Sequence, residues 1–526
     1  MFCHTFKSPW ARVILPLAIL LLLAQTSNAV TNFTWTGASS GLFSTAGNWL
    51  VDQPAPSTLA PRAPSAANGD DFTIFQGGVA TRTVDLASTA RNVRGIRFDS
   101  VAGANAFTFS AAGATTSATS FGFNLRTDGI LNNDNDVQTF NTPVKLFTLA
   151  GGTPALATLF TFNNTLAGGG LTFSGTWSSG IAGKETVNMN GGTLIIDGVA
   201  STTTTIGTSG GGIVSGAGSV LVKNGVGSLV LGGTAANTYS GGTIINDGSV
   251  TAGKINALGS SAAYLAVNGG TLDIGANNQT VGAFTNAGGT INGSGTITAS
   301  GHWLQSGTVN AALGGSGIAL TKTGAGTSTL TAANSYSGNT AINQGTLALT
   351  GSGSIANSPN INVASGAFLD VSAISFSLGA SQTLKGSGTV IGSVTANGTV
   401  APGNSIGTLT LNGDLTLAGI TSMELDRSGS PNSDLIVANN IAQGGTLNVA
   451  NIGVSLLLGD TFNLFDGSIS GSFGSVNLPS LDEGLGWDSS DLAIGGSISV
   501  VAVPEPSTLA CVGLGLVTLV LLRRRK

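Results

Sequence analysis

Charged side chains are scarce in this chain of 526 residues: Asp, Glu, Lys and Arg together make up 8% of it, against about 25% in ordinary globular proteins. Glycine is abundant, with 80 residues. A disordered chain combines few apolar residues with a high net charge, whereas 41% of this sequence is hydrophobic and only 14 residues are proline. The composition therefore favours a folded β-protein that turns often on glycine and asparagine.

Cysteine is nearly missing as well. The two cysteines, Cys3 and Cys511, both lie in the terminal segments, so between them we expect no disulfide, no thiolate metal site and no cysteine nucleophile. The formal net charge is -5, and the central part of the chain is more acidic still, because Lys7, Arg12 and the last four residues are all basic. This charge argues against nucleic-acid binding through counterion release.

The N-terminus has the pattern of a secretory signal peptide. Lys7 and Arg12 precede the apolar run VILPLAILLLLA (13–24), and small residues follow in QTSNA up to Ala29. A basic start, a short apolar stretch and small residues before the cut are typical of such signals. We therefore expect a signal helix within residues 1–29 and cleavage after Ala29. An uncleaved membrane anchor is the alternative, for which the apolar run is short.

Two long segments repeat each other. VLVKNGVGSLVLGGTAANTYSGGTIINDGSV (220–250) and ALTKTGAGTSTLTAANSYSGNTAINQGTL (319–347) share Lys-x-Gly-x-Gly, Ala-Ala-Asn-x-Tyr-Ser-Gly-x-Thr and Ile-Asn-x-Gly. Shorter echoes occur in NGGTLII, NGGTLDI and QGGTLNV. Leucines alternate with other residues in SLVL and in GTLTLNGDLTLAG, and this period of two is typical of short strands bounded by Gly and Asn turns.

Such short strands leave two architectures open, tandem antiparallel sandwiches or one solenoid. The solenoid accounts better for the repeats, because coils of roughly 20–25 residues would stack at about 4.8 Å and line up aliphatic columns inside. About 20 coils would make a rod of roughly 100 Å, with open ends that need caps. Counted from the shared Lys-x-Gly-x-Gly, Leu231 and Leu330 are predicted to occupy equivalent inward columns.

The two long repeats resemble the autotransporter-associated β-strand repeat of bacterial passenger domains. LKGSGTVIGSVTANGTVAPGNSIGTLTLNGDLTL (384–417) is similar to the segment that follows such repeats, and FTWTGASSGLFSTAGNWL (33–50) to their usual opening. The resemblance implies an all-β fold, a right-handed parallel β-helix (β-solenoid). We expect five regions in chain order: a signal peptide (1–29), a Trp-containing N-terminal β segment or cap (30–115), the β-helix (116–454), a C-terminal β segment or cap (455–502) and a sorting segment (503–526).

The tail VPEPSTLACVGLGLVTLVLLRRRK (503–526) closely resembles the PEP-CTERM sorting signal of Gram-negative bacteria, where autotransporters have a membrane β-barrel. The resemblance implies recognition by an exosortase, a membrane protease-transpeptidase. Its motif would be Pro504, Glu505 and Pro506, followed by a transmembrane helix and a cytoplasmic basic stop of Arg523, Arg524, Arg525 and Lys526. Residues 507–522 are uncharged and would form about 24 Å of helix, which snorkelling arginines extend toward the hydrocarbon thickness. A permanent anchor made of the same residues is the alternative.

Candidate catalytic and ligand-binding residues are few. Pairs of carboxylates, which glycoside hydrolysis needs, are Asp70 with Asp71, Asp134 with Asp136, and Asp482 with Glu483. Adjacent strand residues point to opposite faces, and NNDND fits a polar turn better than a calcium loop, since it lacks the glycine and glutamate of an EF-hand.

Histidine and tryptophan offer little more. His302, in GHWLQSG, has no partner set for zinc, and we expect it on the surface or in a turn. Single aromatic residues in β-proteins fill caps and corners or, alternatively, stack on sugar rings; here they are Trp35, Trp49, Trp177, Trp303 and Trp487.

The sequence thus indicates an exported, non-enzymatic β-solenoid without catalytic residues, metal or other cofactor, which crosses the inner membrane and is sorted to the cell envelope, the outer surface or the extracellular matrix. We expect a structural or adhesive role. The expected partners are an exosortase-like processing enzyme, the membrane through the C-terminal helix, and extracellular polysaccharide or other cell-surface components. The alternatives are a polysaccharide-active β-helix enzyme, recognisable by an acidic cleft with Arg or calcium, and a periplasmic or surface glycan-binding protein.

Replacing Pro504, Glu505 and Pro506 together by Ala separates a sorting signal from a plain anchor. The apolar span and the basic end are kept, so an anchor would behave as before, whereas a protease that reads the motif would no longer act. We expect the wild-type body to appear outside the cell without its tail, and the triple variant to accumulate at full length in the inner membrane. Intact mass of the surface and membrane fractions measures this; wild-type surface protein that still ends in Lys526 would leave only the anchor.

Overall fold

A computed structural model gives the fold of residues 192–207 and 213–503 as two continuous stretches. Before them it describes shorter segments: 32–35, 49–52, 72–76, 83–85, 90–99, 107–110, 122–133, 137–140, 144–146, 159–164, 170–173 and 185–189. All regular elements in these ranges are strands. The signal region 1–29 and the tail 504–526 lie outside them, so both expected helices remain predictions. In the parts of the chain that are described, no helix is long and apolar enough to cross a membrane.

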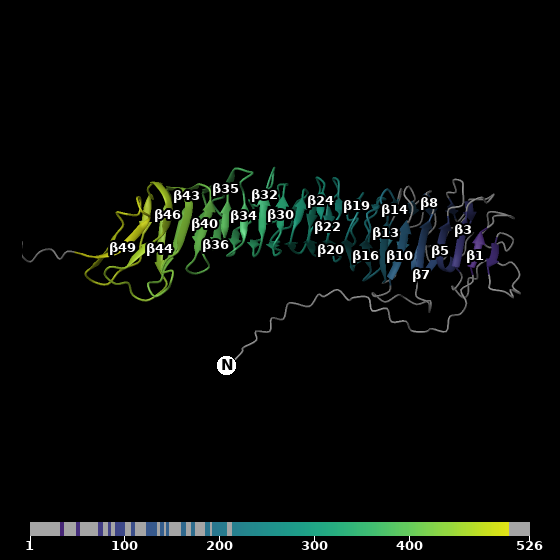
Figure 1. Cartoon of the computed structure of the whole chain (residues 1–526), viewed down its shortest axis with the longest axis horizontal. Helices are drawn as coiled ribbons and strands as arrows, with labels where there is room; N and C mark the ends of the chain where they lie inside the picture. Colours follow the sequence, from purple (N-terminus) through teal and green to yellow (C-terminus); the bar gives the residue numbers. More distant parts are fainter. Residues whose placement is uncertain are drawn as a thin grey trace, which may run out of the picture.

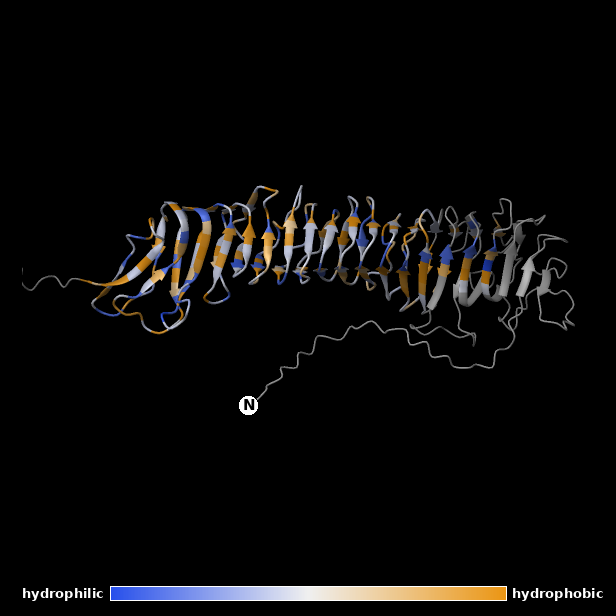
Figure 2. Ribbon diagram, in the orientation of Figure 1, coloured by the Kyte–Doolittle hydropathy of each residue, from blue (hydrophilic) through white to orange (hydrophobic). Residues whose placement is uncertain are grey.

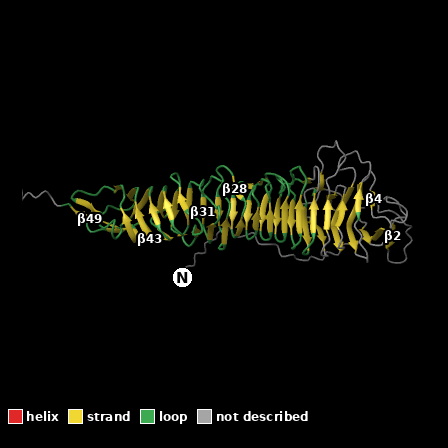
Figure 3. Cartoon of the chain, turned by 90° about the horizontal axis from the view of Figure 1, so that it is seen from above, coloured by secondary structure: helices red, strands yellow, loops and turns green. Residues whose placement is uncertain are grey.

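The strands stack into one elongated rod, with the chain advancing along it from β1 to β49 (Figure 1). Seen from above, strands and short turns continue along the whole described length (Figure 3). One coil illustrates the path: β20 (Tyr264–Val267), β21 (Thr271–Asp273) and β22 (Gln279–Thr280) follow three faces, after which β23 (Phe284–Asn286) pairs in parallel with β20. The predicted all-β solenoid with parallel strands is confirmed, and its right-handed sense stays a prediction.

Face 1 is the longest parallel ladder. It begins where β1 (Asn32–Trp35) pairs in parallel with β3, while β2 (Trp49–Asp52) lies antiparallel on β1. Its strands in stacking order are β3 (Phe72–Gln76), β5 (Ala90–Asp99), β7 (Gly122–Asn133), β10 (Leu159–Asn164), β13 (Thr193–Gly198), β16 (Val220–Lys223), β18 (Gly242–Ile245), β20, β23, β26 (His302–Leu304), β29 (Leu320–Lys322), β31 (Thr340–Ile342), β33 (Asn360–Val363), β36 (Thr383–Gly386), β39 (Thr399–Pro402), β42 (Ile420–Leu425), β44 (Thr446–Asn451) and β47 (Ser475–Asn477).

Face 2 carries the second parallel ladder. Its strands are β4 (Thr83–Asp85), β6 (Thr108–Ser110), β8 (Val137–Phe140), β11 (Gly170–Phe173), β14 (Thr203–Ile206), β17 (Ser228–Leu231), β19 (Ser249–Ala252), β21, β24 (Thr290–Asn292), β27 (Gly307–Val309), β30 (Thr327–Leu330), β32 (Thr346–Leu349), β34 (Phe368–Asp370), β37 (Thr389–Ile391), β40 (Thr408–Asn412), β43 (Leu435–Gln443) and β46 (Phe465–Gly471).

Face 3 is interrupted. Three short ladders lie on it, made of β9 (Val144–Leu146), β12 (Glu185–Asn188) and β15 (Ile213–Ser215), then β22, β25 (Thr296–Thr298) and β28 (Ala312–Gly314), then β35 (Phe376–Leu378), β38 (Val394–Ala396) and β41 (Leu415–Leu417). The first ladder begins on the N-terminal halves of β5 and β7, and the last continues into the C-terminal halves of β43 and β46. Between these ladders, single backbone hydrogen bonds such as that from Thr238 N to the carbonyl oxygen of Val214 link neighbouring coils, and side chains add further contacts.

The interior consists of stacked aliphatic columns. On face 2, Leu229 pairs with Val250, and the column continues through Leu272, Ile291 and Val309; all are buried. The residues between them point outward, so buried and more exposed positions alternate along these strands. Hydrophobic residues recur along the stacked strands (Figure 2). This alternation is the period of two in the sequence, since only one side of each strand faces the core.

One detail of the predicted register is wrong. Leu231 and Leu330 both point inward and have no exposed surface, but Leu330 pairs with Val309 and therefore continues the column of Leu229. The strand of the second repeat has slid by two residues along face 2, although the repeat lysines stay in one column of face 1. A slip of two keeps every side chain on its own side of the sheet, so the alternation in sequence does not reveal it.

The short Gly-Gly-Thr echoes are turns that precede strands. NGGTLDI leads from β20 on face 1 into β21 on face 2, whereas NGGTLII and QGGTLNV lead into β13 and β44 on face 1. Gly270 of NGGTLDI and Gly445 of QGGTLNV both have positive φ, 63° and 62°, which L-residues other than glycine seldom adopt. A Cβ on Gly270 would also lie 2.5 Å from the carbonyl oxygen of Gly248 in the previous coil. The glycines therefore set both the bend and the close stacking of successive turns.

An antiparallel sheet lies at the C-terminal end of the rod. β49 (Ser497–Ala502) pairs antiparallel with β45 (Thr461–Asn463) and with β48 (Leu485–Asp488). Trp487, on β48, donates from its ring nitrogen to the carbonyl oxygen of Pro479 at 2.8 Å. This sheet covers part of the edge that the last coil leaves open; the exact boundary at residue 455 stays a prediction.

Leu231→Asp should destabilise the rod far more than Val230→Asp. The first places a carboxylate in the column between Ile206 and Ala252, at a cost of more than about 3 kcal/mol; the second adds a charge to the half-exposed outer side of the same strand and should cost less than about 1 kcal/mol. Chemical denaturation of both variants measures the difference, and equal losses would contradict the inward register.

Candidate functional site

The lysine of each long repeat is a core residue. Lys223 and Lys322 lie in the inward column of face 1 and are buried. The Nζ of Lys223 donates to the carbonyl oxygens of Asn224 and Gly225, the latter at 2.6 Å, and that of Lys322 to Gly324 and Gln344, the latter at 3.1 Å. Burial lowers the pKa of both ammonium groups. These lysines close the turn between face 1 and face 2, which accounts for the shared Lys-x-Gly-x-Gly.

The repeated asparagine links neighbouring coils where face 3 has no strand. The Oδ1 of Asn237 accepts a hydrogen bond from the backbone N–H of Val214 in the preceding coil, at 2.9 Å. In the second repeat, the Oδ1 of Asn334 accepts one from the N–H of Leu313, also at 2.9 Å. Each Nδ2 donates to a carbonyl oxygen of the following coil, Ala257 or Ser354. A buried side chain thus adds hydrogen bonds between coils to the few that the backbone makes here.

The repeated tyrosine fills the adjoining corner. Tyr239 and Tyr336 are fully buried, and each hydroxyl bonds the threonine four residues later, Tyr239 to Thr243 at 2.6 Å and Tyr336 to Thr340 at 2.8 Å. Burial raises the pKa of both phenols, so both remain neutral donors. The two long motifs are therefore structural throughout, and none of these side chains faces solvent.

The carboxylate pairs do not form a catalytic site in the parts of the chain that the structure covers. Asp70 with Asp71 and Asp134 with Asp136 lie outside the described residues. Asp482 and Glu483 are exposed neighbours in the turn before β48. Within the described ranges, no group of three His, Cys, Asp or Glu residues is placed to hold a metal ion.

His302 is not the surface or turn residue that the sequence suggested. It lies on β26 and is buried. Its ring packs edge-on against the ring of Phe284, with 6.1 Å between ring centroids, and its centroid is 5.9 Å from that of Tyr336. Its Nε2 lies 3.0 Å from the carbonyl oxygen of Gly314. Because a carbonyl oxygen can only accept, Nε2 carries the proton of the neutral ring, and the buried Nδ1 has no hydrogen-bond partner. Burial lowers its pKa to about 4. The sequence did not predict this core position, because the preceding residues Ser300 and Gly301 are typical of a turn.

One small polar pocket of about 180 Å³ lies where face 1 approaches the C-terminal end. Lys385, Asn404, Ser422, Glu424 and Asp434 line it, with backbone from residues 401–403. Asp434 is 1% exposed, and its two oxygens accept from the backbone N–H groups of Gly407 and Glu424, each at 2.8 Å. Burial raises its pKa to about 7. Since both oxygens already accept hydrogen bonds from the backbone, this carboxylate has a structural role: it links the segments that contain Gly407 and Glu424.

A larger hollow of about 410 Å³ lies at the corner before face 3, between residues 351–356 and 373–377. Glycine, serine and alanine make up most of its lining, with Ile355, Ile374 and Phe376. None of these lining residues is charged, so the hollow provides shape without a group for acid–base chemistry.

Two exposed aromatic rings on face 1 form the best-defined binding feature. Tyr264 and Trp303 are 37% and 39% exposed and point outward from β20 and β26. Each ring lies flat over a glycine: a Cβ on Gly242 would be 2.6 Å from the Tyr264 ring, and one on Gly301 would be 2.4 Å from the Trp303 ring. The rings therefore cover backbone in coils that are three steps apart, about 14 Å along the rod.

Only small side chains lie on the surface between the two rings. The outward residues there are Ala266, Ala283 and Thr285, each half-buried, and Trp303 pairs with Thr285 and Thr321 of the neighbouring coils. Because none of these side chains rises above the sheet, the outer face of each ring is open to a ligand. We call this surface, from Tyr264 to Trp303 on face 1, the aromatic face. The sequence named Trp303 as a candidate, but gave no sign of Tyr264.

Comparison with known proteins places two features of the chain. Residues 221–252 and 320–349 match the passenger-associated-transport-repeat, and residues 502–526 match the PEP-CTERM protein-sorting motif. A segment of 69 residues is 39% identical to the adhesin BmaC autotransporter of Brucella suis biovar 1 (strain 1330), covering 13% of this chain. The segment spans only 2% of that adhesin's length.

His302→Phe should remove an acid sensitivity of the fold. The folded pKa lies near 4, below the ordinary value of about 6.5, so the unfolded chain binds more protons between these values. The contribution of neutral His302 to the free energy of unfolding is therefore fully present above pH 6.5. It is lost as the pH falls to 4, by up to about 3 kcal/mol. The difference in unfolding free energy between wild type and variant at pH 7, 5.5 and 4 measures this loss. Trp303→Phe, on the outward neighbour, is the control, and curves of wild type and His302→Phe that run parallel would contradict the assignment.

Proposed function

We propose that this chain, which carries passenger-associated transport repeats and a PEP-CTERM sorting motif, is an exported, surface-associated solenoid with a structural and adhesive role. Its ligand on this proposal is extracellular polysaccharide, held along the aromatic face. Export to the envelope or surface follows from the sorting motif and the repeats. Processing by an exosortase-type enzyme follows from the same motif, and delivery to the matrix is part of the proposal.

The aromatic face is the observation that carries the adhesive role. A pyranose ring has one or both faces lined by C–H groups, and a flat aromatic ring offers a complementary apolar surface. Tyr and Trp also give large rigid contact areas at low cost in conformational entropy. Two such platforms about 14 Å apart suit a polymer of several sugar residues better than a single small sugar. The likeness to an adhesin over 69 residues agrees with this role.

The repeat chemistry supports a scaffold rather than an enzyme. Four polar residues that both long repeats share, the Lys of Lys-x-Gly-x-Gly and the Asn, Tyr and Thr of Ala-Ala-Asn-x-Tyr-Ser-Gly-x-Thr, are buried and hydrogen-bonded within the rod. The alternative of a polysaccharide-active enzyme draws support from the pocket with Glu424 and Asp434. Glycosidases need two carboxylates that reach the substrate, and Asp434 is enclosed and bonded through both oxygens. We therefore favour binding.

Trp303→Ala and Tyr264→Ala should each weaken polysaccharide binding by about tenfold, and together abolish avid retention. The measurement is binding of the exported chain to a panel of immobilised bacterial exopolysaccharides, with denaturation curves to verify that both variants are folded. Phe368→Ala is the matched control, because Phe368 is an equally exposed aromatic residue (36%) on face 2. Binding that falls equally with all three variants, or with none, would contradict the aromatic face as the ligand site.

A further inference from the structure

Exposed apolar side chains gather at the C-terminal end of the rod. One loop, residues 452–458 between β44 and β45, exposes four of them, Ile452 (49%), Val454 (52%), Leu457 (48%) and Leu458 (62%). Further exposed apolar residues follow in the same terminal region: Val476, Ile494, Val501 and Val503. Along the other described coils exposed large apolar residues occur singly, so this cluster needs a partner.

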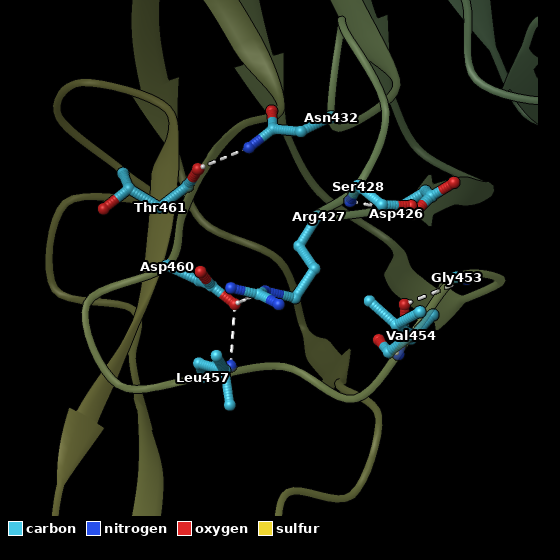
Figure 4. Close-up of polar contacts among 10 residues, drawn as sticks. Asp426, Arg427, Ser428, Asn432, Gly453, Val454, Leu457, Asp460 and Thr461 are labelled. Atoms are coloured by element: carbon cyan, nitrogen blue, oxygen red, sulfur yellow. Dashed lines mark hydrogen bonds and ion pairs between the residues drawn. The ribbon is translucent and has the colours of Figure 1, made fainter.

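The loop is held in a fixed shape. Asp460 Oδ2 accepts from Leu457 N at 2.7 Å and from Arg427 Nε at 2.9 Å, which ties the loop to the turn after β42 (Figure 4). Asn451 Nδ2 donates to the carbonyl oxygen of Val454 at 2.8 Å, and Leu456 between the exposed residues is buried. These hydrogen bonds fix the backbone of the loop in a shape that leaves its four apolar side chains exposed.

The same bonds place the loop beside the start of the tail. Gly459 N donates to the carbonyl oxygen of Val500, and Val500 N to that of Asp460, both at 2.9 Å. Three residues later the described chain ends at Val503. Only Pro504, Glu505 and Pro506 separate it from the uncharged apolar residues 507–522. Four extended residues reach at most about 14 Å, roughly twice the thickness of the headgroup layer of one leaflet.

We propose that loop 452–458 rests on the outer leaflet of the membrane that holds the tail, with Ile452, Val454, Leu457 and Leu458 in contact with lipid. The short connection keeps this end of the rod close to the membrane while residues 507–522 are inserted. A lipid surface suits this patch, because residues 452–458 contain no charged side chain and the ion pair at their base, Arg427 with Asp460, is formed within the protein. The contact holds Pro504, Glu505 and Pro506 at the membrane surface, where an integral-membrane protease reaches them.

The contact is also temporary. A small apolar patch alone gives weak, reversible membrane binding, and stable anchoring takes a second signal. Here the second signal is the tail, so removing it releases the patch as well. The rod would then leave the membrane without refolding.

Depth-dependent fluorescence tests the contact on the full chain. Cys3→Ser and Cys511→Ser remove the native thiols, and Leu458→Cys introduces one site for an environment-sensitive dye. The protein is reconstituted in phosphatidylcholine–phosphatidylglycerol vesicles with or without lipids that carry a quencher near the headgroup. We expect a blue-shifted emission at position 458 and at least a twofold loss of intensity with quencher lipids.

Two controls fix the interpretation. Ile255→Cys in the same background labels an equally exposed side chain (60%) far along the rod and should stay unshifted and unquenched. Native Cys511, labelled in a chain with Cys3→Ser only, should be quenched and so verifies that the tail is inserted. With that control satisfied, a label at 458 that behaves like the one at 255 overturns the proposal. A blue shift without lipid quenching also overturns it, because a protein surface would then cover the loop.

Discussion

Parallel pairing of each coil with the next is the constraint on which this whole structure depends. Strands in the middle of faces 1 and 2 find their hydrogen-bond partners in the coil before and the coil after. The thin interior is filled by the stacked columns, Leu229 on Val250 on Leu272 and onward. The inward side chains of all three faces share one thin core, and each coil contributes only a few of them, so each coil depends on its neighbours for stability. Successive turns must follow one another closely, which is why glycine occupies the bends and charged residues are few.

The repeat motifs solve the problem of corners in such a rod. Where face 3 has no strand, the amide of Asn237 or Asn334 adds hydrogen bonds between coils, and a buried tyrosine fills the space behind it. The lysine ammonium satisfies carbonyl oxygens that a tight turn leaves unpaired. These are the strongest sequence signals in the chain, and the structure explains them without reference to any ligand. Function therefore belongs to positions that the repeats do not share.

Those positions lie outside the columns. The outward side of face 1 has small residues over several coils, and on this floor Tyr264 and Trp303 lie across glycines with their outer faces open. At the far end, the loop from 452 to 458 turns apolar side chains outward beside the last strand. A rod separates two such surfaces by many coils, so its middle can bind a polymer while its end meets a membrane. On the proposed function, the fold supplies the spacing of these surfaces and a few exposed side chains supply the recognition.

The sequence by itself determined the class of fold, because strand period, glycine turns and a long internal repeat leave few ways to bury the apolar residues. It also indicated export and sorting, which rest on linear motifs that need no tertiary context. It did not determine the column of Leu330, since a slip of two residues leaves the alternation unchanged. Nor did it place His302 in the core, or bring Tyr264 into line with Trp303. Those outcomes depend on which coil lies beside which, and the lengths of the turns decide that only when the rod is assembled.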